Sequence, residues 1–256
     1  MHTLPRPRLT ASFLHFLFSC LVFFSFIAVL LLLWFPAPYF SASGGWQGLR
    51  LVAAVDLVLG PLLTLIVFDI SKPRRELITD LSLIALLQLS ALAWGIWTVY
   101  QQRPVAAVFW QGSFYTVPAR ALVSQGADLD GLNRFGSSRP VYVFAEPPRD
   151  EQGHLAMLRE VETTQAPPHE HLHRYRRLAD HFDEIRRHKG VDIEEIVSTN
   201  ADMESRLSEI LTKTGVSRED NHYVALVSRY RNIVLVYDRQ DQLIGTLNAP
   251  LKSGPR

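Results

Sequence analysis

Cysteine is nearly absent from this chain of 256 residues, and charge of one sign is not in excess. The single cysteine, Cys20, lies in an apolar run, so the rest of the chain has no internal disulfide and no cysteine-rich metal site. The 26 Lys and Arg residues are balanced by 25 Asp and Glu residues. This balance argues against nucleic acid as the main partner. Because it has no disulfide, the part of the chain beyond the apolar runs must be stabilised by a hydrophobic core.

Charge is also scarce in the first part of the chain. Only six of the 26 basic residues and four of the 25 acidic residues precede residue 101. The sequence thus predicts two domains, an apolar membrane region over residues 1–104 and an ordinary α+β domain over residues 105–256. The second part has the length of one typical domain.

Three apolar runs, at about residues 13–35, 50–69 and 81–101, are each near the roughly 20 residues that cross a bilayer. A cleavable signal ending near Ser41–Ser43 is the rival interpretation of the first run, which is longer than a signal core. The loop before Arg50 has no basic residue, whereas the SKPRRE loop after the second run has three. Basic loops face the cytoplasm, so we expect a cytoplasmic N-terminus and a periplasmic second domain.

The second run contains features that are costly in a membrane. Asp56 is ionisable, and the Gly60-Pro61 pair interrupts helical hydrogen bonding, so both need partners. Pro61 has no N–H to donate to the carbonyl of Leu57, and we expect Gln88 or Thr64 to satisfy that carbonyl. The polar and small positions that we predict to contact a partner are Asp56, Gly60, Pro61, Thr64, Gln88 and Gly95.

Asp56 has three possible roles. It lies near enough to one end of its helix to be hydrated or to pair with Arg50. It could also contact a charged group on another membrane protein, or belong to a proton or ion pathway. One acidic residue within three spans gives little support to a pathway.

The residues of the second and third runs carry a family resemblance. The stretches VDLVLGPLLTLIVFD and DLSLIALLQLSALAWGIWTVYQQRPVAAVF resemble the TfpX/TfpZ family of type IV pilin accessory proteins. The clearest matching points are Asp56, Gly60, Pro61, Thr64, Asp80, Gln88, Gly95, Arg103 and Pro104.

This resemblance implies an inner-membrane protein that supports a type IV pilin during pilus biogenesis, with the lipid bilayer as its other partner. It implies no enzyme activity, no cofactor and no catalytic residue. Asp80, Arg103 and Pro104 are implied as family positions without an assigned role.

The pattern of the second domain predicts a small antiparallel sheet with helices on one face. VAAVFW and SFYTV predict a hairpin, and VYVFA predicts a further strand. Apolar residues at helical spacing predict a helix over Glu170–Lys189, and a second helix opens near Asn200 and stops at Gly215. The predicted closing strands are 223–227, 233–237 and 243–247.

One motif points to a different function. His169-Glu170-His171-Leu172-His173 matches H-E-x-x-H, in which two histidines on one helix face bind zinc and the glutamate is the general base. The alternative hypothesis is therefore a membrane-anchored zinc metallopeptidase that uses His169, Glu170 and His173. The motif directly follows Pro167-Pro168, which places His169 at a fraying helix start, so adventitious metal binding is favoured over catalysis.

Overall fold

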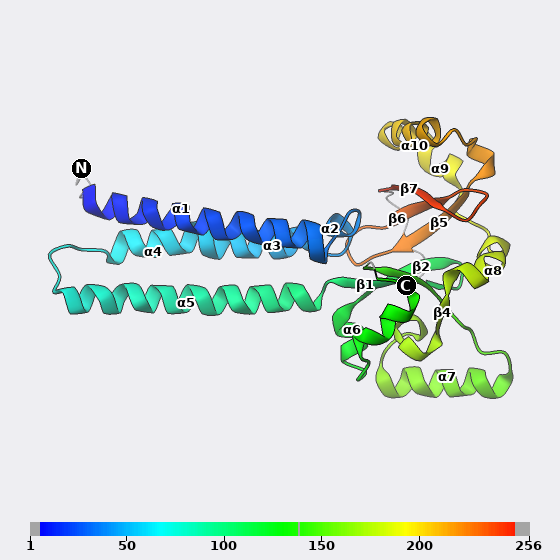
Figure 1. The fold of residues 1–256 in the computed structure, drawn as a ribbon, viewed down its shortest axis with the longest axis horizontal. Helices are drawn as coiled ribbons and strands as arrows, with labels where there is room; N and C mark the ends of the chain where they lie inside the picture. The colour runs from blue at the N-terminus through cyan, green and yellow to red at the C-terminus, as the bar shows by residue number, and fades with distance from the viewer. Residues whose placement is uncertain (1–5, 138, 249–256) are drawn as a thin grey trace. The chain divides into compact units, whose positions relative to one another are not determined.

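The computed structural model describes residues 6–137 and 139–248, which divide into two compact units (Figure 1). Residues 6–40 and 44–101 form the helical unit, and residues 41–43 and 102–248 form the sheet unit. The last eight residues of the predicted second domain, 249–256, lie outside the described residues.

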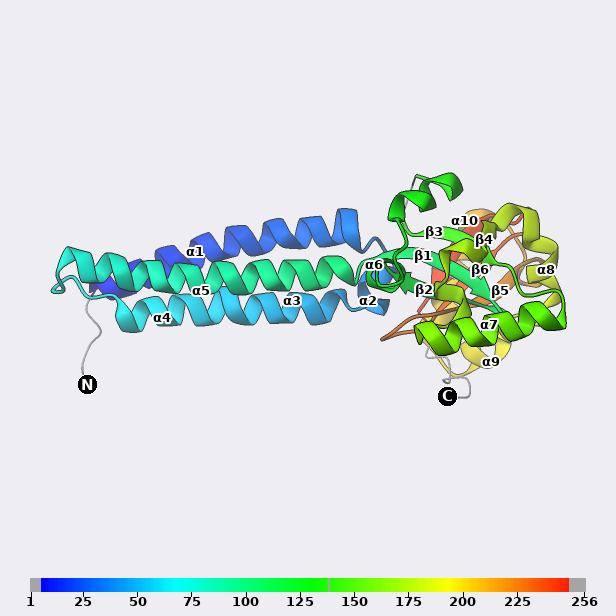
Figure 2. The same ribbon diagram turned by 90° about the horizontal axis from the view of Figure 1, so that it is seen from below.

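The helical unit consists of three long helical segments that run side by side (Figures 1 and 2). Each is long and apolar enough to span a membrane, as the sequence predicts: residues 6–34, 45–67 and 74–101. In order, the elements are α1 (Arg6–Val29), η1 (Leu30–Trp34), α2 (Tyr39–Ala42), α3 (Gly45–Ala53), η2 (Ala54–Leu59), α4 (Gly60–Val67) and α5 (Arg74–Gln101).

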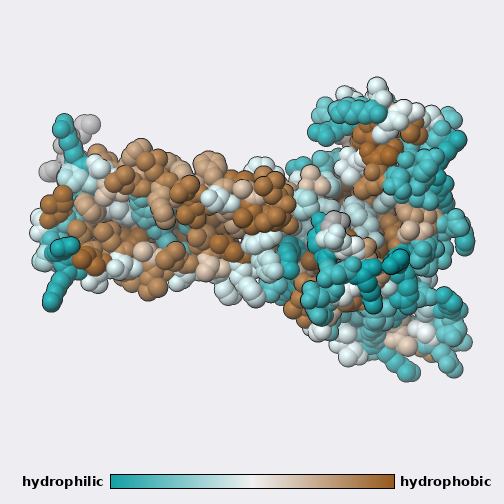
Figure 3. Space-filling model, in the orientation of Figure 1, coloured by the Kyte–Doolittle hydropathy of each residue, from teal (hydrophilic) through white to brown (hydrophobic). Residues whose placement is uncertain are grey.

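Two of these elements, η1 and η2, have the wider π-helical turn. The outer surface of the helical unit is largely hydrophobic (Figure 3), with Phe18, Leu32 and Trp94 between 65% and 77% exposed. Such an apolar exterior suits contact with lipid tails.

The interior of the helical unit is apolar in one half. Phe23, Phe26 and Leu30 of the first segment pack there against Leu49 and Val52 of the second. The other half contains the buried polar side chains of this unit, Ser19, Asp56, Thr64 and Gln88.

The sheet unit contains one seven-stranded sheet in the order β4-β3-β1-β2-β5-β6-β7. Its strands are β1 (Pro104–Trp110), β2 (Ser113–Pro118), β3 (Val141–Ala145), β4 (Tyr175–Arg177), β5 (His222–Val227), β6 (Ile233–Tyr237) and β7 (Leu243–Leu247). Its helices are α6 (Ala119–Val123), η3 (Leu129–Phe135), α7 (Glu151–Thr164), η4 (Pro168–Glu170), η5 (Leu172–Arg174), η6 (Leu178–His181), α8 (Phe182–Arg187), α9 (Ile193–Ser198), α10 (Ala201–Thr214) and η7 (Arg218–Asp220).

The predicted small antiparallel sheet is wrong, because the sheet is mixed. The β1–β2 hairpin lies at its centre, and β3 and β5 join the hairpin in parallel, one on each side. Parallel neighbours need crossover connections, which the helices between β2 and β3 and between β3 and β5 provide. A central strand is covered on both faces, and every residue of β1 is buried.

The single helix predicted over Glu170–Lys189 is also wrong. That segment contains two 3₁₀ turns, the short strand β4, a third 3₁₀ turn and the short helix α8. Tyr175 and Ile185 are buried as predicted, but from a strand and a helix respectively. The α10 helix agrees with the prediction, since Asn200 caps its start and Gly215 adopts the left-handed conformation at its end.

Candidate functional site

A cavity of about 600 Å³ lies among the three helical segments. Its lining is mostly apolar and includes polar side chains from all three segments. The lining residues are Ala11, Leu14, His15, Phe18, Ser19, Val22, Asp56, Thr64, Phe68, Leu81, Ile84, Ala85, Gln88, Leu89 and Leu92. We call this cavity the membrane pocket. Concave, largely apolar sites with a few convergent polar groups are typical of ligand and partner binding.

The membrane pocket contains most of the buried polar side chains of the described chain. Ser19, Asp56, Thr64 and Gln88 are all at most 9% exposed. The predicted partner positions Asp56, Thr64 and Gln88 are thus brought together around one cavity. Polar groups in such surroundings are costly unless they are hydrogen-bonded.

The first segment supplies partners that the sequence analysis missed. Ser12 Oγ donates to the carbonyl of Pro61 at 2.8 Å, and His15 Nδ1 lies 2.6 Å from Thr64 Oγ1. Arg8 also forms an ion pair with Asp69. Together with Ser19, these residues of α1 recur every three or four positions. This spacing indicates a row of polar side chains along one face of the helix, and it can be read from the sequence.

The predicted role of Gln88 and Thr64 is wrong in its detail. Among the described residues no hydrogen bond joins either side chain to the Leu57 carbonyl, and Thr64 is bonded to His15 instead. The chain accommodates Pro61 through the π-helical stretch η2, in which the Gly60 N–H donates to Val55 five residues back. A wider turn relieves the clash between a proline ring and the preceding turn.

Gly60 allows the second and third segments to approach closely. A Cβ atom on Gly60 would lie 1.8 Å from Gln88 Nε2, so the Gln88 amide occupies the space that a side chain would fill. Gly95 is different, because a Cβ there would meet Val52 at an ordinary 3.7 Å. Of the two predicted glycines, only Gly60 is required by close packing.

Asp56 is buried at the membrane pocket with incomplete hydrogen bonding. It is 5% exposed, and its Oδ2 has no hydrogen-bond partner. Within the described residues it forms no ion pair with Arg50, so the predicted pairing is not formed. A buried carboxylate that lines a cavity and has one oxygen without a partner is suited to receive a donor or a cation from another molecule.

The other family positions lie outside the membrane pocket. Asp80 accepts a 2.7 Å hydrogen bond from Lys72, and this bond raises the pKa of Lys72 above its usual value. The Arg103 carbonyl accepts from the Ala119 N–H, and Pro104 begins β1 opposite Pro118. These contacts order the loop after α4 and the start of the sheet.

The H-E-x-x-H segment does not form the helix that zinc peptidases need. His169 lies in η4 and His173 in η5, two separate turns. The His169 ring stacks on Tyr115 with 4.3 Å between centroids, and burial lowers its pKa to about 4. His173 instead shares a cluster with His171 and Glu160, a residue of α7 that the sequence analysis missed. The geometry therefore does not support the metallopeptidase alternative.

The chain is similar to fimbrial assembly proteins of Dichelobacter nodosus. It is 39% identical over 98 residues to those of serogroup E1, of serogroups C1 and C2, and of serogroup I. The match covers 38% of this chain and 38%, 75% and 38% of the three relatives. No family model matches the chain, and no solved structure matches it significantly. On the identity and the three-quarters coverage of the relative from serogroups C1 and C2, the chain belongs to this family of fimbrial assembly proteins.

Proposed function

We propose that this chain is an inner-membrane accessory protein of type IV pilus biogenesis, of the TfpX/TfpZ kind, which binds the membrane helix of a pilin and catalyses no reaction. The names of its relatives support a role in assembling fimbriae. The observation that carries the proposal is the membrane pocket with the unpartnered Oδ2 of Asp56.

The energetics favour a partner for Asp56. Asp56 lies at the middle of the segment 45–67, so the position predicted for it near one end of the helix is wrong. An aspartate near the centre of a membrane helix costs about 2.5 to 3.5 kcal/mol. A hydrogen-bond donor or cation on a partner helix offsets part of that cost, so binding becomes favourable at this position. The neighbouring Gln88 and Thr64 already have contacts, with Gly60 and His15, which leaves Asp56 as the anchor.

The proposed orientation has the N-terminus in the cytoplasm and the sheet unit in the periplasm. The Arg8–Asp69 ion pair joins the start of α1 to the loop between α4 and α5, which contains Lys72 and leads into Arg74 and Arg75 of α5. A common cytoplasmic side for these four basic residues agrees with the distribution of charge in membrane proteins.

The first test is pilus formation in a strain that lacks the protein. Wild type should restore surface pili, and so should Val58→Ala, which changes a residue of the same segment that is 62% exposed. Asp56→Asn keeps the shape of the side chain but removes its charge, and it should fail to restore pili although the protein accumulates normally. Restoration by Asp56→Asn would contradict the role of Asp56.

A second test locates the partner. A photoreactive residue at position 89, where Leu89 lines the membrane pocket, should crosslink to pilin. The control is position 83 on the same helix, because Leu83 is equally exposed, 66% against 64%, but is not among the pocket residues. Equal crosslinking at both positions, or crosslinking at neither, would contradict binding at the membrane pocket.

Packing at the glycines gives a third comparison. Gly60→Leu should abolish capture of pilin, because the new side chain displaces Gln88 into the membrane pocket. Gly95→Ala should leave capture unchanged, since its Cβ has room. Capture by Gly60→Leu at the wild-type level would show that the pocket is not the binding surface.

A further inference from the structure

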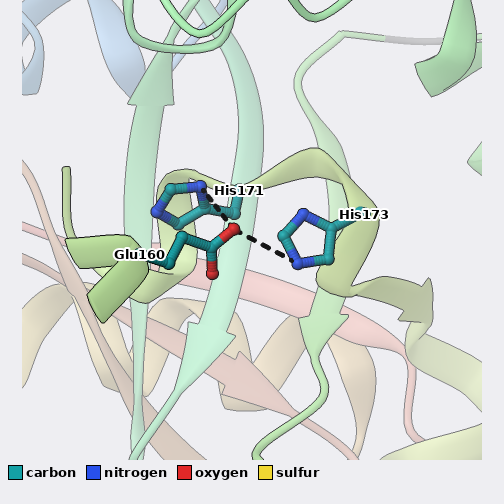
Figure 4. Close-up of side chains that lie close together, drawn as sticks. All are labelled: Glu160, His171 and His173. Carbon is teal, nitrogen blue, oxygen red and sulfur yellow. Dashed lines mark ion pairs between the residues drawn. The ribbon is translucent and has the colours of Figure 1, made fainter. Parts of the chain in front are cut away.

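A second candidate site lies in the sheet unit and shares no residue with the membrane pocket. Glu160 of α7 directs its carboxylate between the rings of His171 and His173, as Figure 4 shows. One ligand atom from each residue lies within 4.8 Å of the others. Two imidazole nitrogens and a carboxylate oxygen are the ligands of many zinc sites.

We propose that Glu160, His171 and His173 bind a zinc-class divalent metal ion. This inference is independent of the proposed function. The site shares only His173 with the H-E-x-x-H motif, because His169 and Glu170 take no part in it.

The distances agree with a tetrahedral site. Glu160 Oε1 lies 3.5 Å from His171 Nδ1 and 3.5 Å from His173 Nε2, and both dashed lines in Figure 4 end on this one oxygen. Ligands bound to zinc at about 2.0 to 2.1 Å in a tetrahedron are separated by roughly 3.4 Å. Two edges of the tetrahedron are therefore already set, and the exposed His173 can adjust to complete the third.

The hydrogen bond of His171 determines which ring nitrogen faces the carboxylate as an acceptor. His171 is 4% exposed, and its Nε2 lies 3.3 Å from the Ala166 carbonyl oxygen. A carbonyl only accepts, so Nε2 carries the hydrogen and Nδ1 of the neutral ring presents a lone pair to Glu160. Two acceptors at 3.5 Å repel each other unless a proton or a metal ion lies between them, and a metal ion is the occupant that we propose. A metal-bound histidine commonly donates its other N–H to a backbone carbonyl in this way.

The carboxylate is held in place by its second oxygen. Arg174 donates to Glu160 Oε2 at 2.6 Å, which leaves Oε1 directed at the two histidines. The positive charge of Arg174 favours the ionised form of this carboxylate, which is the form that binds a metal ion.

The loop that carries the histidines is also fixed by hydrogen bonds. Tyr175 Oη donates to the His169 carbonyl at 2.8 Å, and Gln125 Nε2 donates to the Glu170 carbonyl at 3.1 Å. The Arg174 N–H donates to the His171 carbonyl at 3.1 Å. Metal sites need such support, because loosely held ligands lose affinity.

The three ligands leave the fourth tetrahedral position open. The side chain of His173 is 61% exposed, so the open position faces the surface of the sheet unit. A water molecule or a side chain of a second protein can complete the coordination.

The test is zinc binding by the full chain in detergent micelles after removal of metal with a chelator. Titration with Zn²⁺ against a chromophoric chelator should show one site per chain. His173→Ala, which alters an exposed side chain, and Glu160→Gln, which keeps the shape of the ligand, should each weaken binding at least tenfold.

Two further histidines serve as controls. His154→Ala removes an exposed histidine from the same helix, and His169→Phe keeps the stacking on Tyr115 while it removes the first histidine of the motif. Both variants should bind zinc within twofold of wild type.

Three outcomes would overturn the proposal. These are no stoichiometric binding by wild type, unchanged binding by His173→Ala and Glu160→Gln, and an equal loss in the two controls. Because the readout is metal affinity, pilus formation does not enter the result, and the proposed function can fail or hold independently.

Discussion

The helical unit and the sheet unit place polar and apolar groups in opposite ways. In the sheet unit, residues such as Val108, Phe114 and Leu226 are fully buried, and charged side chains lie outside. In the helical unit, large apolar residues lie outside, while Asp56, Thr64 and Gln88 are buried. In the sheet unit, whose surface suits water, a buried polar group is an exception. In the helical unit, whose surface suits lipid tails, the interior is where polar groups find hydrogen-bond partners.

The same difference decides what holds each unit together. Burial of a large apolar side chain contributes about 1.5 to 3 kcal/mol where the alternative is water. Lipid tails are as apolar as leucine, so this term is missing between membrane helices, and close packing and hydrogen bonds take its place. The Gly60–Gln88 contact and the His15–Thr64 bond are examples.

The largest effect should come from matched phenylalanines in the two units. Phe114→Ala opens a cavity in the sheet core and should reduce the free energy of unfolding by about 3 to 5 kcal/mol. Phe13→Ala, at a side chain 59% exposed on α1, should change it by no more than about 0.5 kcal/mol. Hydrogen exchange of β1 and β2 amides measures the first, and unfolding in sodium dodecyl sulfate measures the second. Similar costs in the two units would break the comparison.

A smaller effect is expected from matched threonines within the helical unit. Thr64→Val removes the bond to His15 and should cost roughly 0.6 to 1.7 kcal/mol, the range for hydrogen bonds between membrane helices. Thr98→Val is the control, because Thr98 is exposed and its hydroxyl donates to the Trp94 carbonyl of its own helix. We expect that control to be near neutral in the same unfolding assay. A neutral Thr64→Val would show that the bond does not stabilise the helical unit.

The smallest effect concerns pH and should separate the two units. Burial is the main cause that lowers the pKa of His222 below its ordinary value of 6.5. The unfolded state then binds a proton more readily than the folded state, so the sheet unit should lose stability as pH falls below 6.5. His222→Asn should reduce this loss. An unchanged pH dependence in that variant would assign the effect to other groups.

In the helical unit the corresponding loss should start at lower pH. Hydrogen bonds from Ser71, together with Arg8, lower the pKa of Asp69 to about 2 from 3.8. The contribution of this carboxylate is therefore present above pH 3.8 and is lost as pH falls through about 2. Protection factors, in which the intrinsic pH dependence of amide exchange is divided out, should thus decrease in β5 between pH 6 and pH 4 and remain constant at the start of α1.

Local patterns predicted individual elements well and their neighbours poorly. The hairpin, the VYVFA strand and the three closing strands were confirmed, because each is a short apolar run bounded by turn residues. The parallel pairing of β1 with β3 was missed, since a strand pattern does not specify its partner. Within Glu170–Lys189 the apolar spacing imitated a helix, whereas tertiary packing placed Tyr175 in a strand.

The candidate sites also contain residues that the local sequence predicts and residues that only the folded chain brings together. Asp56, Thr64 and Gln88 were predicted from costly groups in apolar runs, and the structure brings them to one cavity; their binding role stays a prediction. His15 was missed although it lies at helical spacing from Ser12 and Ser19. Glu160 could not be found from the histidine-rich segment, because α7 buries only Met157 and has a weak apolar pattern. Only folding brings this helix to His171 and His173.

The π-helical stretch η2 has a consequence for the length of the chain. One additional residue in a helix rotates everything that follows by about 100° around the axis. Pro61 and Thr64 face Ser12 and His15 in this rotated phase. A deletion of a single residue between Ala54 and Leu59 would therefore preserve composition and hydropathy, yet turn both residues away from α1. In this segment the residue count matters as much as residue identity.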